Sequence, residues 1–146
     1  MSILWKDAGL RENENCTDTY AIFTLSSNYL DSINITELLK IQPDFIKSGN
    51  CSTEINSVFI DKQENIWALS SQRQIITTSS EKHLIFLLEK LERVQSQLIK
   101  LINHCSLTAV FHCYWINAGF LGGPVLSAEV MQRIANLHAY LRFEFI

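Results

Sequence analysis

Two His-Cys pairs, His104-Cys105 and His112-Cys113, are the residues of this sequence whose types suggest chemistry, because imidazole and thiolate bind soft metals and cooperate in nucleophilic catalysis. Their spacing argues against both. His112 and Cys113 are neighbours in a stretch that alternates along a strand, so their side chains point to opposite faces. No sequence pattern places a histidine beside a thiol. We therefore expect no metal site, no cofactor and no catalytic residue, and interpret Cys113 as a buried apolar side chain.

A glycine-rich segment, GFLGGP over 119–124, offers a second candidate for chemistry, since glycines ahead of a helix can hold a phosphate on backbone amides. No lysine follows the glycines, and Pro124 removes one amide donor. The segment is therefore better interpreted as a turn. Ser127 follows it as a predicted helix N-cap, with helical apolar spacing from Val130 to Leu137.

The stretch 107–116 must position these groups, and its alternation predicts a strand with one core face. The closing residues 140–146 alternate in the same way and predict a last, ordered strand. On the core side of the first of these strands we expect Leu107, Ala109, Phe111, Cys113 and Trp115. The other side carries Thr108, Val110, His112, Tyr114 and Ile116.

The first half of the chain predicts a strand beginning near Tyr20 and a short helix capped by Asp31 or Ser32 and ended by Pro43. A loop over 46–57 and a hairpin of strands at 58–60 and 66–70 are expected next. A single amphipathic helix of about 23 residues follows, bent or straight. It begins at a capping box formed by Thr78 and Glu81.

This order of elements favours an α+β fold, with a largely antiparallel sheet and about three helices packed on one face. A weak internal echo aligns Leu30 with Leu126 and allows two pseudo-repeated β-α-β halves. Residues 1–17 are polar and aperiodic, and predict a flexible N-terminal arm ahead of a single domain over 18–146.

The composition restricts the expected partners and cellular location of the protein. The chain has 146 residues, 47% hydrophobic and 18% charged, with a net charge of -3, so there is no basic field to attract nucleic acid. No signal-peptide core or membrane-length apolar stretch is present, and we expect no membrane association and a cytosolic location. In that compartment its four cysteines are expected to be reduced thiols.

The side of the sheet away from the helices is the candidate binding surface. If the first, fourth and last long strands are neighbours, this side gathers tyrosines, a histidine and a charged pair amid aliphatic residues, a composition typical of interaction surfaces. The alternative is a solvated face on which Arg142 and Glu144 pair with neighbouring strands. The binding residues predicted by this hypothesis are Tyr20, His112, Tyr114, Tyr140, Arg142 and Glu144.

Several blocks of sequence, in order and spacing, are similar to those of a known family. They are YAIFTLSS, SINITELLKIQPD, IWALSS, EKHLIFLLEKLE, FHCYWINAGFLGGPVLSAEVMQRIANL and YLRFEFI, and they span most of 20–146. In these blocks the chain resembles the bacterial family catalogued as domain of unknown function 4279. It departs from the family at FIKSGNCST, where members often carry basic and aromatic residues. The resemblance implies a small, stand-alone bacterial cytosolic domain and brings no activity, cofactor or catalytic residue.

We therefore expect an uncharacterised, non-enzymatic protein-interaction module, of which an immunity protein that neutralises a toxin is one kind. Its partner would be an unknown protein or a second copy in a homodimer. The alternative is a small-molecule-binding protein or an enzyme, with a pocket between the open sheet face and the GFLGGP turn. That pocket would use His112, Tyr114, Arg142 or Glu144.

Overall fold

The computed structural model describes residues 5–13, 15–48, 65–119 and 122–146 of the chain. Its helices are the 3-10 helix η1 (Trp5–Leu10) and the α-helices α1 (Ser32–Leu39), α2 (Ser80–Glu92), α3 (Gln95–His104) and α4 (Ala128–Asn136). Its strands are β1 (Cys16–Ser27), β2 (Phe45–Lys47), β3 (Asn65–Ser70), β4 (Thr108–Asn117) and β5 (Tyr140–Phe145).

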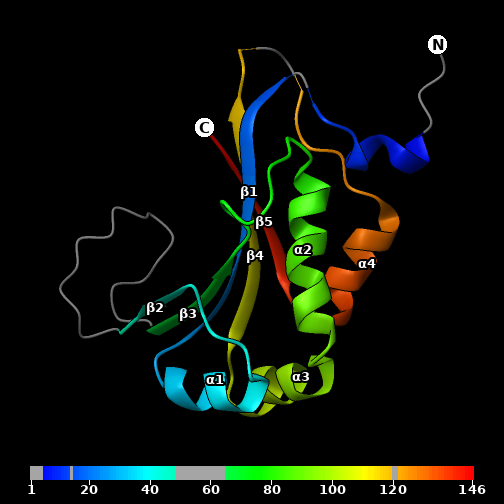
Figure 1. Ribbon diagram of the computed structural model, residues 1–146. Coiled ribbons are helices and arrows are strands. Elements are labelled where there is room, and N and C mark those ends of the chain that lie inside the picture. The colour runs from blue at the N-terminus through cyan, green and yellow to red at the C-terminus, as the bar shows by residue number, and fades with distance from the viewer. Residues whose placement is uncertain (1–4, 14, 49–64, 120–121) are drawn as a thin grey trace.

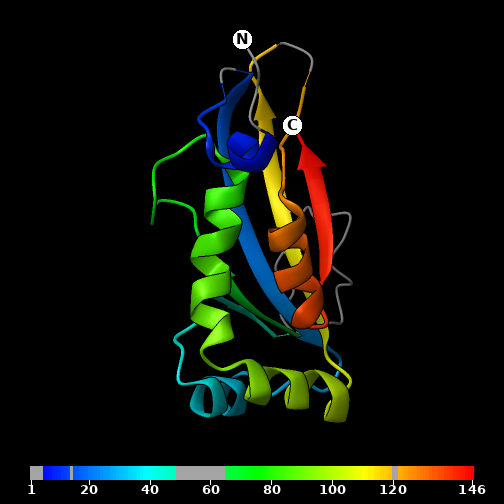
Figure 2. The same cartoon turned by 90° about the vertical axis from the view of Figure 1, so that its right-hand side faces the viewer.

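One five-stranded sheet of order β2-β3-β1-β4-β5 organises the fold. Strand β1 pairs antiparallel with both β3 and β4, and β2 pairs antiparallel with β3. Only the β4–β5 pair is parallel among the described strands. Helices α2 and α4 cover one face, and α1 and α3 lie across one end (Figures 1 and 2). The predicted α+β class and the largely antiparallel sheet are confirmed.

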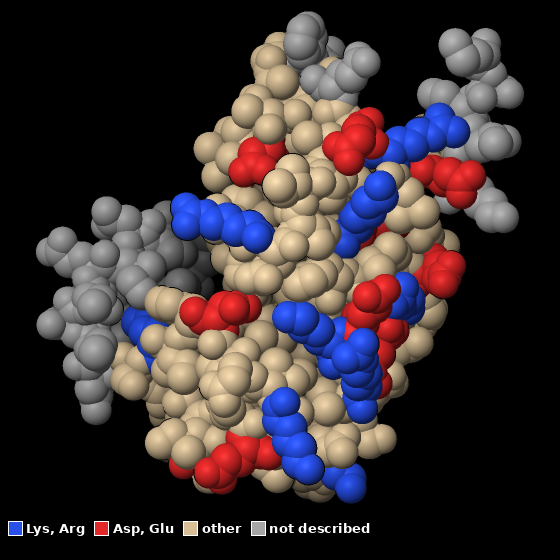
Figure 3. Space-filling view, in the orientation of Figure 1, with Lys and Arg blue, Asp and Glu red and all other residues tan. Residues whose placement is uncertain are grey.

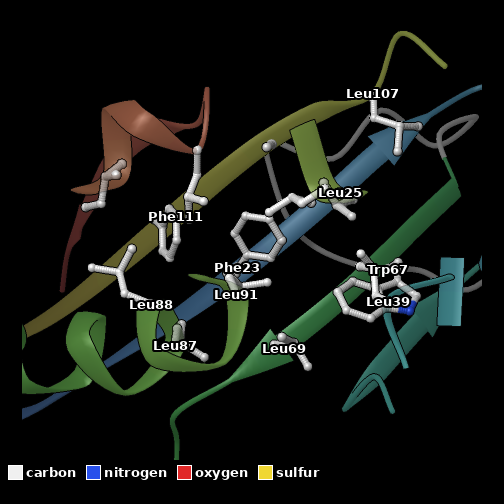
Figure 4. Packing of buried hydrophobic residues seen from close by; sticks show 14 of the residues in the cluster. Phe23, Leu25, Leu39, Trp67, Leu69, Leu87, Leu88, Leu91, Leu107 and Phe111 are labelled. Atoms are coloured by element: carbon white, nitrogen blue, oxygen red, sulfur yellow. The ribbon is translucent and has the colours of Figure 1, made fainter. Parts of the chain in front are cut away.

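The core lies between the covered sheet face and α2. Phe23 of β1 stands opposite Phe111 of β4, with ring centroids 4.9 Å apart, and both side chains are fully buried. Leucines of α2 meet the two rings (Figure 4). The predicted core alternation of β4 is confirmed, because Leu107, Ala109, Phe111, Cys113 and Trp115 are all buried. Burial raises the pKa of the Cys113 thiol to about 11, as expected for a thiol in the core.

Three side-chain caps fix where helices begin. Asp31 accepts hydrogen bonds from the first amides of α1, Ser79 accepts from Lys82 N, and Ser127 accepts from Val130 N. The caps at Asp31 and Ser127 are confirmed. The cap of α2 is Ser79 and not Thr78, because Thr78 instead binds Glu12.

The single long helix predicted from Thr78 onward is wrong. The apolar stripe continues without interruption, but the backbone breaks at Arg93 and Val94, and α3 turns away to lie across the end of the sheet (Figure 2). Leu91 before the break and Leu98 after it are both fully buried. Two helices therefore share one stripe because they bury it against different parts of the core.

Residues 5–13 make close contacts with the start of α2. A Cβ placed on Gly9 would lie 2.5 Å from Val125 O, so only glycine fits there. The Glu12 carboxylate accepts hydrogen bonds from the hydroxyls of Thr77 and Thr78 and from Thr78 N, and these bonds lower its pKa to about 2. The polarity of this segment predicts a flexible arm, whereas its described part is anchored by these contacts.

The middle of the chain differs from the predicted loop and hairpin. Strand β3 matches the second predicted hairpin strand, but the first, at 58–60, lies outside the described residues. Strand β2, at Phe45–Lys47, pairs with β3 and overlaps the start of the predicted loop. The two halves also connect differently, because β1 and β2, on either side of α1, are not neighbours in the sheet, whereas β4 and β5, on either side of α4, pair in parallel. The internal echo therefore does not extend to topology.

The N-cap of α4 gives a direct test of this local structure. Ser127→Ala removes the acceptor for Val130 N and is expected to lower the free energy of unfolding by about 1 kcal/mol. Ser96→Ala, an exposed position in α3, is the control and should change it by less than about 0.5 kcal/mol. Urea unfolding followed by circular dichroism measures both. Equal losses in the two variants would contradict the role of the cap.

Candidate binding site

The open sheet face brings the six predicted binding residues into three adjacent rows. Register places Tyr20, Tyr114 and Glu144 in one row across β1, β4 and β5. The next row holds Ile22, His112 and Arg142, and the third holds Thr24, Val110 and Tyr140. These side chains alternate with buried core residues along each strand, so they lie on the side away from α2 and α4.

Tyr20 and Tyr114 form a stacked pair at one end of this surface. Their ring centroids are 4.7 Å apart and their planes differ by 16°. Burial raises the pKa of both phenols, and the charge of Asp18 acts in the same direction on Tyr20. Both tyrosines are therefore neutral at physiological pH and offer a rigid aromatic body with a polar tip.

His112 occupies the middle row and is neutral at pH 7. Its Nε2 lies 3.0 Å from Thr24 Oγ1 in a hydrogen bond whose donor depends on the tautomer. Burial, and then the nearby Arg142 guanidinium, lower the pKa of His112 to about 4. Its Nδ1 makes no hydrogen bond to any described residue. The imidazole is thus held by one nitrogen, with the other able to meet a ligand.

Arg142 and Glu144 form an ion pair within strand β5. Arg142 Nε lies 2.8 Å from Glu144 Oε1, and the two residues are on the same face two positions apart. Glu144 Oε1 is buried, and the contact is not aligned as a hydrogen bond. This pair lies within one strand, and Arg142 makes a further interaction besides it.

A cavity of about 280 Å³ is hollowed into this face. Its apolar lining comes from the central strands and β2, namely Ile22, Phe45, Ile66, Ala68, Leu69 and Val110. Its polar lining consists of Thr24, Ser26, Asp44, Ser70, Thr108, His112, Tyr114 and Arg142. The volume lies at the lower end of the range of small-molecule pockets, roughly 300–1,000 Å³.

Three of the six predicted residues, His112, Tyr114 and Arg142, line this cavity. Tyr20, Tyr140 and Glu144 lie beside it on the same face. The described glycines of the GFLGGP turn do not line it, so the cavity is not at that turn. Asp44 and Phe45 were missed because they lie between the helix-ending Pro43 and the start of the predicted loop at residue 46. The apolar pair Phe45-Ile46, two residues after Pro43, was the signal that could have marked a strand.

A second histidine, His83, sits in a buried network that sequence patterns did not reveal. His83 Nε2 lies 3.0 Å from the Thr77 carbonyl, so it is the donor, and neutral Nδ1 accepts from Ser71 Oγ at 2.7 Å. Ser71 Oγ also accepts from Ala21 N. Burial lowers the pKa of His83. Both side chains are almost fully buried, and this Ser-His pair ties β1 to α2.

The arrangement on the open face supports binding better than catalysis. A histidine with a pKa near 4 is a weak general base at neutral pH, and no third group orients the Thr24–His112 pair among the described residues. No group of three or more potential metal ligands occurs in the described ranges. No helix there is long and apolar enough to cross a bilayer. The face shown in Figure 3 carries both basic and acidic side chains, interspersed over its surface.

The fold and site define a class, an α+β protein with one helix-covered sheet face and one open face that holds a cavity. The family model "Domain of unknown function (DUF4279)" matches residues 16–145. The chain therefore belongs to this family, in agreement with the resemblance seen in the sequence. No curated protein and no solved structure matches the chain.

The lowered pKa of His112 makes stability depend on pH in a defined direction. The folded state favours the neutral His112 imidazole. The contribution of His112 to the free energy of unfolding is therefore fully present above a pH of about 6.5 and is lost as the pH falls toward about 4. His112→Gln is expected to lose less stability than the wild type between about pH 7 and about pH 5. Urea midpoints at the two pH values measure the difference.

His104→Gln is the matched control, since it removes an exposed imidazole at the end of α3. This variant is expected to keep the wild-type dependence on pH. The His83 imidazole remains in both variants and contributes the same direction of change. If the His112 and His104 variants behaved alike, burial of His112 would not be a source of acid sensitivity.

Proposed function

We propose that the protein is a non-enzymatic binding module whose open sheet face receives a protein partner, with the cavity holding one large apolar side chain of that partner. The cavity of about 280 Å³ carries this proposal. A volume of this size suits an aromatic or large aliphatic side chain, and its apolar floor removes that side chain from water. Hydrogen-bonding groups at its border, such as His112 and Thr24, would fix the orientation.

The surroundings of the cavity favour a protein over a free small molecule. Tyr140, at the β5 side of the face, is 69% exposed and does not line the cavity, so a ligand that fills the cavity alone would leave it uncovered. Phe45, at the β2 side, lines the cavity and is still 46% exposed. Tyrosines around a central apolar pocket are the arrangement of interface hot spots. Asp44 at the β2 side and Arg142 at the β5 side add opposite charges that would orient a partner segment across the strands.

A small-molecule binder is the second candidate, favoured by the concave shape of the same cavity. An immunity-type role is one case of the leading proposal. It stays a prediction, as do the bacterial and cytosolic setting expected from the sequence. Both candidates place the occupant against the same cavity residues. They can therefore be distinguished by comparing how tightly a small molecule and a peptide bind there.

Indole, the side chain of tryptophan, is the probe for the cavity. Titration into isotope-labelled protein should shift the amide signals of Ile22, Thr24 and His112 in a saturable way. Val110→Trp fills the cavity from within and is expected to abolish these shifts. Met131→Trp, at an exposed position on α4, is the control and should keep them.

The leading proposal further requires that a peptide bind more tightly than indole, because it also contacts the surface around the cavity. A tryptophan-centred peptide flanked by one lysine and one glutamate should bind roughly tenfold or more tightly than indole. Equal affinity of peptide and indole would favour the small-molecule candidate. Absence of saturable shifts at the cavity residues would overturn both.

A further inference from the structure

Strand β5 ends the sheet, and no described strand pairs with its outer edge (Figure 2). Ile146 N donates to Trp115 O and Ile146 O accepts from Asn117 N, so the backbone of residue 146 points toward β4. Backbone direction repeats every two residues in a strand. Leu141, Phe143 and Phe145 therefore direct their N–H and C=O groups away from the sheet.

The side chains along this edge are unusually apolar for an exposed strand. Tyr140 and Ile146 are each 69% exposed, Phe145 is 65% exposed and Phe143 is 37% exposed. Natural sheet edges are commonly protected by charges, proline or a bulge, because unpaired backbone groups invite another strand. Here the only charged residues of the strand are Arg142 and Glu144, which have opposite signs.

We propose that β5 pairs antiparallel with β5 of a second copy of this chain, about a two-fold axis through Phe143. In this register Arg142 lies opposite Glu144 of the second copy, and by symmetry Glu144 lies opposite its Arg142. Phe143 faces Phe143, and Leu141 faces Phe145, so the outward backbone groups of both strands meet as hydrogen-bonded pairs. The edge is thus complementary to itself in charge, apolar character and backbone polarity.

Other registers lose this complementarity. A shift of two residues in either direction places Arg142 opposite Arg142 or Glu144 opposite Glu144, and like charges directly opposite destabilise a strand pair. A shift of one residue sets outward backbone groups against groups already bonded to β4. Charge and backbone geometry therefore select the same register.

The state of Glu144 supports the same pairing. Its Oε1 is buried without an aligned hydrogen bond, although it lies 2.8 Å from Arg142 Nε. In the proposed dimer, Arg142 and Glu144 of opposite copies form non-hydrogen-bonded pairs, in which side chains approach most closely. Oε1 itself is covered within the chain, but 19% of the Glu144 side chain is exposed, and the guanidinium of the second copy would approach this exposed part. The two ion pairs would then become one network across the seam.

This inference does not rest on the proposed binding function, although Arg142 belongs to both surfaces. The contact is one strand wide, which is small beside a standard interface of about 1,600 Å², so we expect dissociation at roughly micromolar concentrations. Sedimentation velocity of the wild-type chain from about 1 to about 300 μM covers that range. A reversible monomer–dimer equilibrium is expected, and a monomer at every concentration would overturn the proposal.

Charge reversal tests the register. Arg142→Glu places Glu opposite Glu at both symmetric positions, and Glu144→Arg places Arg opposite Arg. Each single variant is expected to dimerise about tenfold or more weakly than the wild type. The double variant Arg142→Glu with Glu144→Arg restores opposite charges and should dimerise like the wild type.

Mixing the two single variants gives the sharpest outcome. In a mixed dimer every Glu of one chain meets an Arg of the other, so the mixture should associate where each variant alone does not. This result excludes misfolding as the cause of the single-variant losses, and circular dichroism of each variant provides a second check. Dimerisation of the single variants as tight as that of the wild type, or no association in the mixture, would overturn the proposed pairing.

Discussion

The antiparallel pairing of β1 with β4 is the interaction on which the rest of the structure depends. It runs from Cys16 opposite Asn117 to Ser26 opposite Thr108, and it separates two sets of side chains that alternate along both strands. One set, centred on Phe23 and Phe111, forms the core under α2. The other forms the floor of the open face. A slip of one residue would exchange the two sets and destroy core and cavity together.

Alternation and capping were predictable because they are local. The core side of β4 and the caps at Asp31 and Ser127 follow from spacing within a few residues. The shared face of the six candidate residues needs, in addition, that β1, β4 and β5 be neighbours in the sheet. The break between α2 and α3 was not predictable, since the apolar stripe continues through Val94 and only tertiary packing shows that its two halves bury against different surfaces. The same holds for β2, whose short length leaves almost no period to detect.

The candidate site likewise depends partly on local sequence pattern and partly on contacts between residues that are far apart in the sequence. Sequence placed His112, Tyr114 and Arg142 on one face, but the cavity needs Asp44, Phe45 and the β3 residues as well, and their approach depends on strand order. Likewise Ser71 and His83 read as ordinary polar residues, and only the fold joins them. The polar composition of residues 5–13 predicts a flexible arm, whereas Gly9 and Glu12 contact the start of α2.

The central place of β1 in the sheet also governs when the protein can fold. Its neighbour β4 follows far along the chain, and the Thr24–His112 hydrogen bond joins residues separated by 88 positions. During synthesis β1 must therefore wait, with Phe23 and Leu25 unprotected, until most of the chain has emerged. Closing so long a loop costs entropy before any contact repays it, which slows folding and exposes the waiting strand to aggregation.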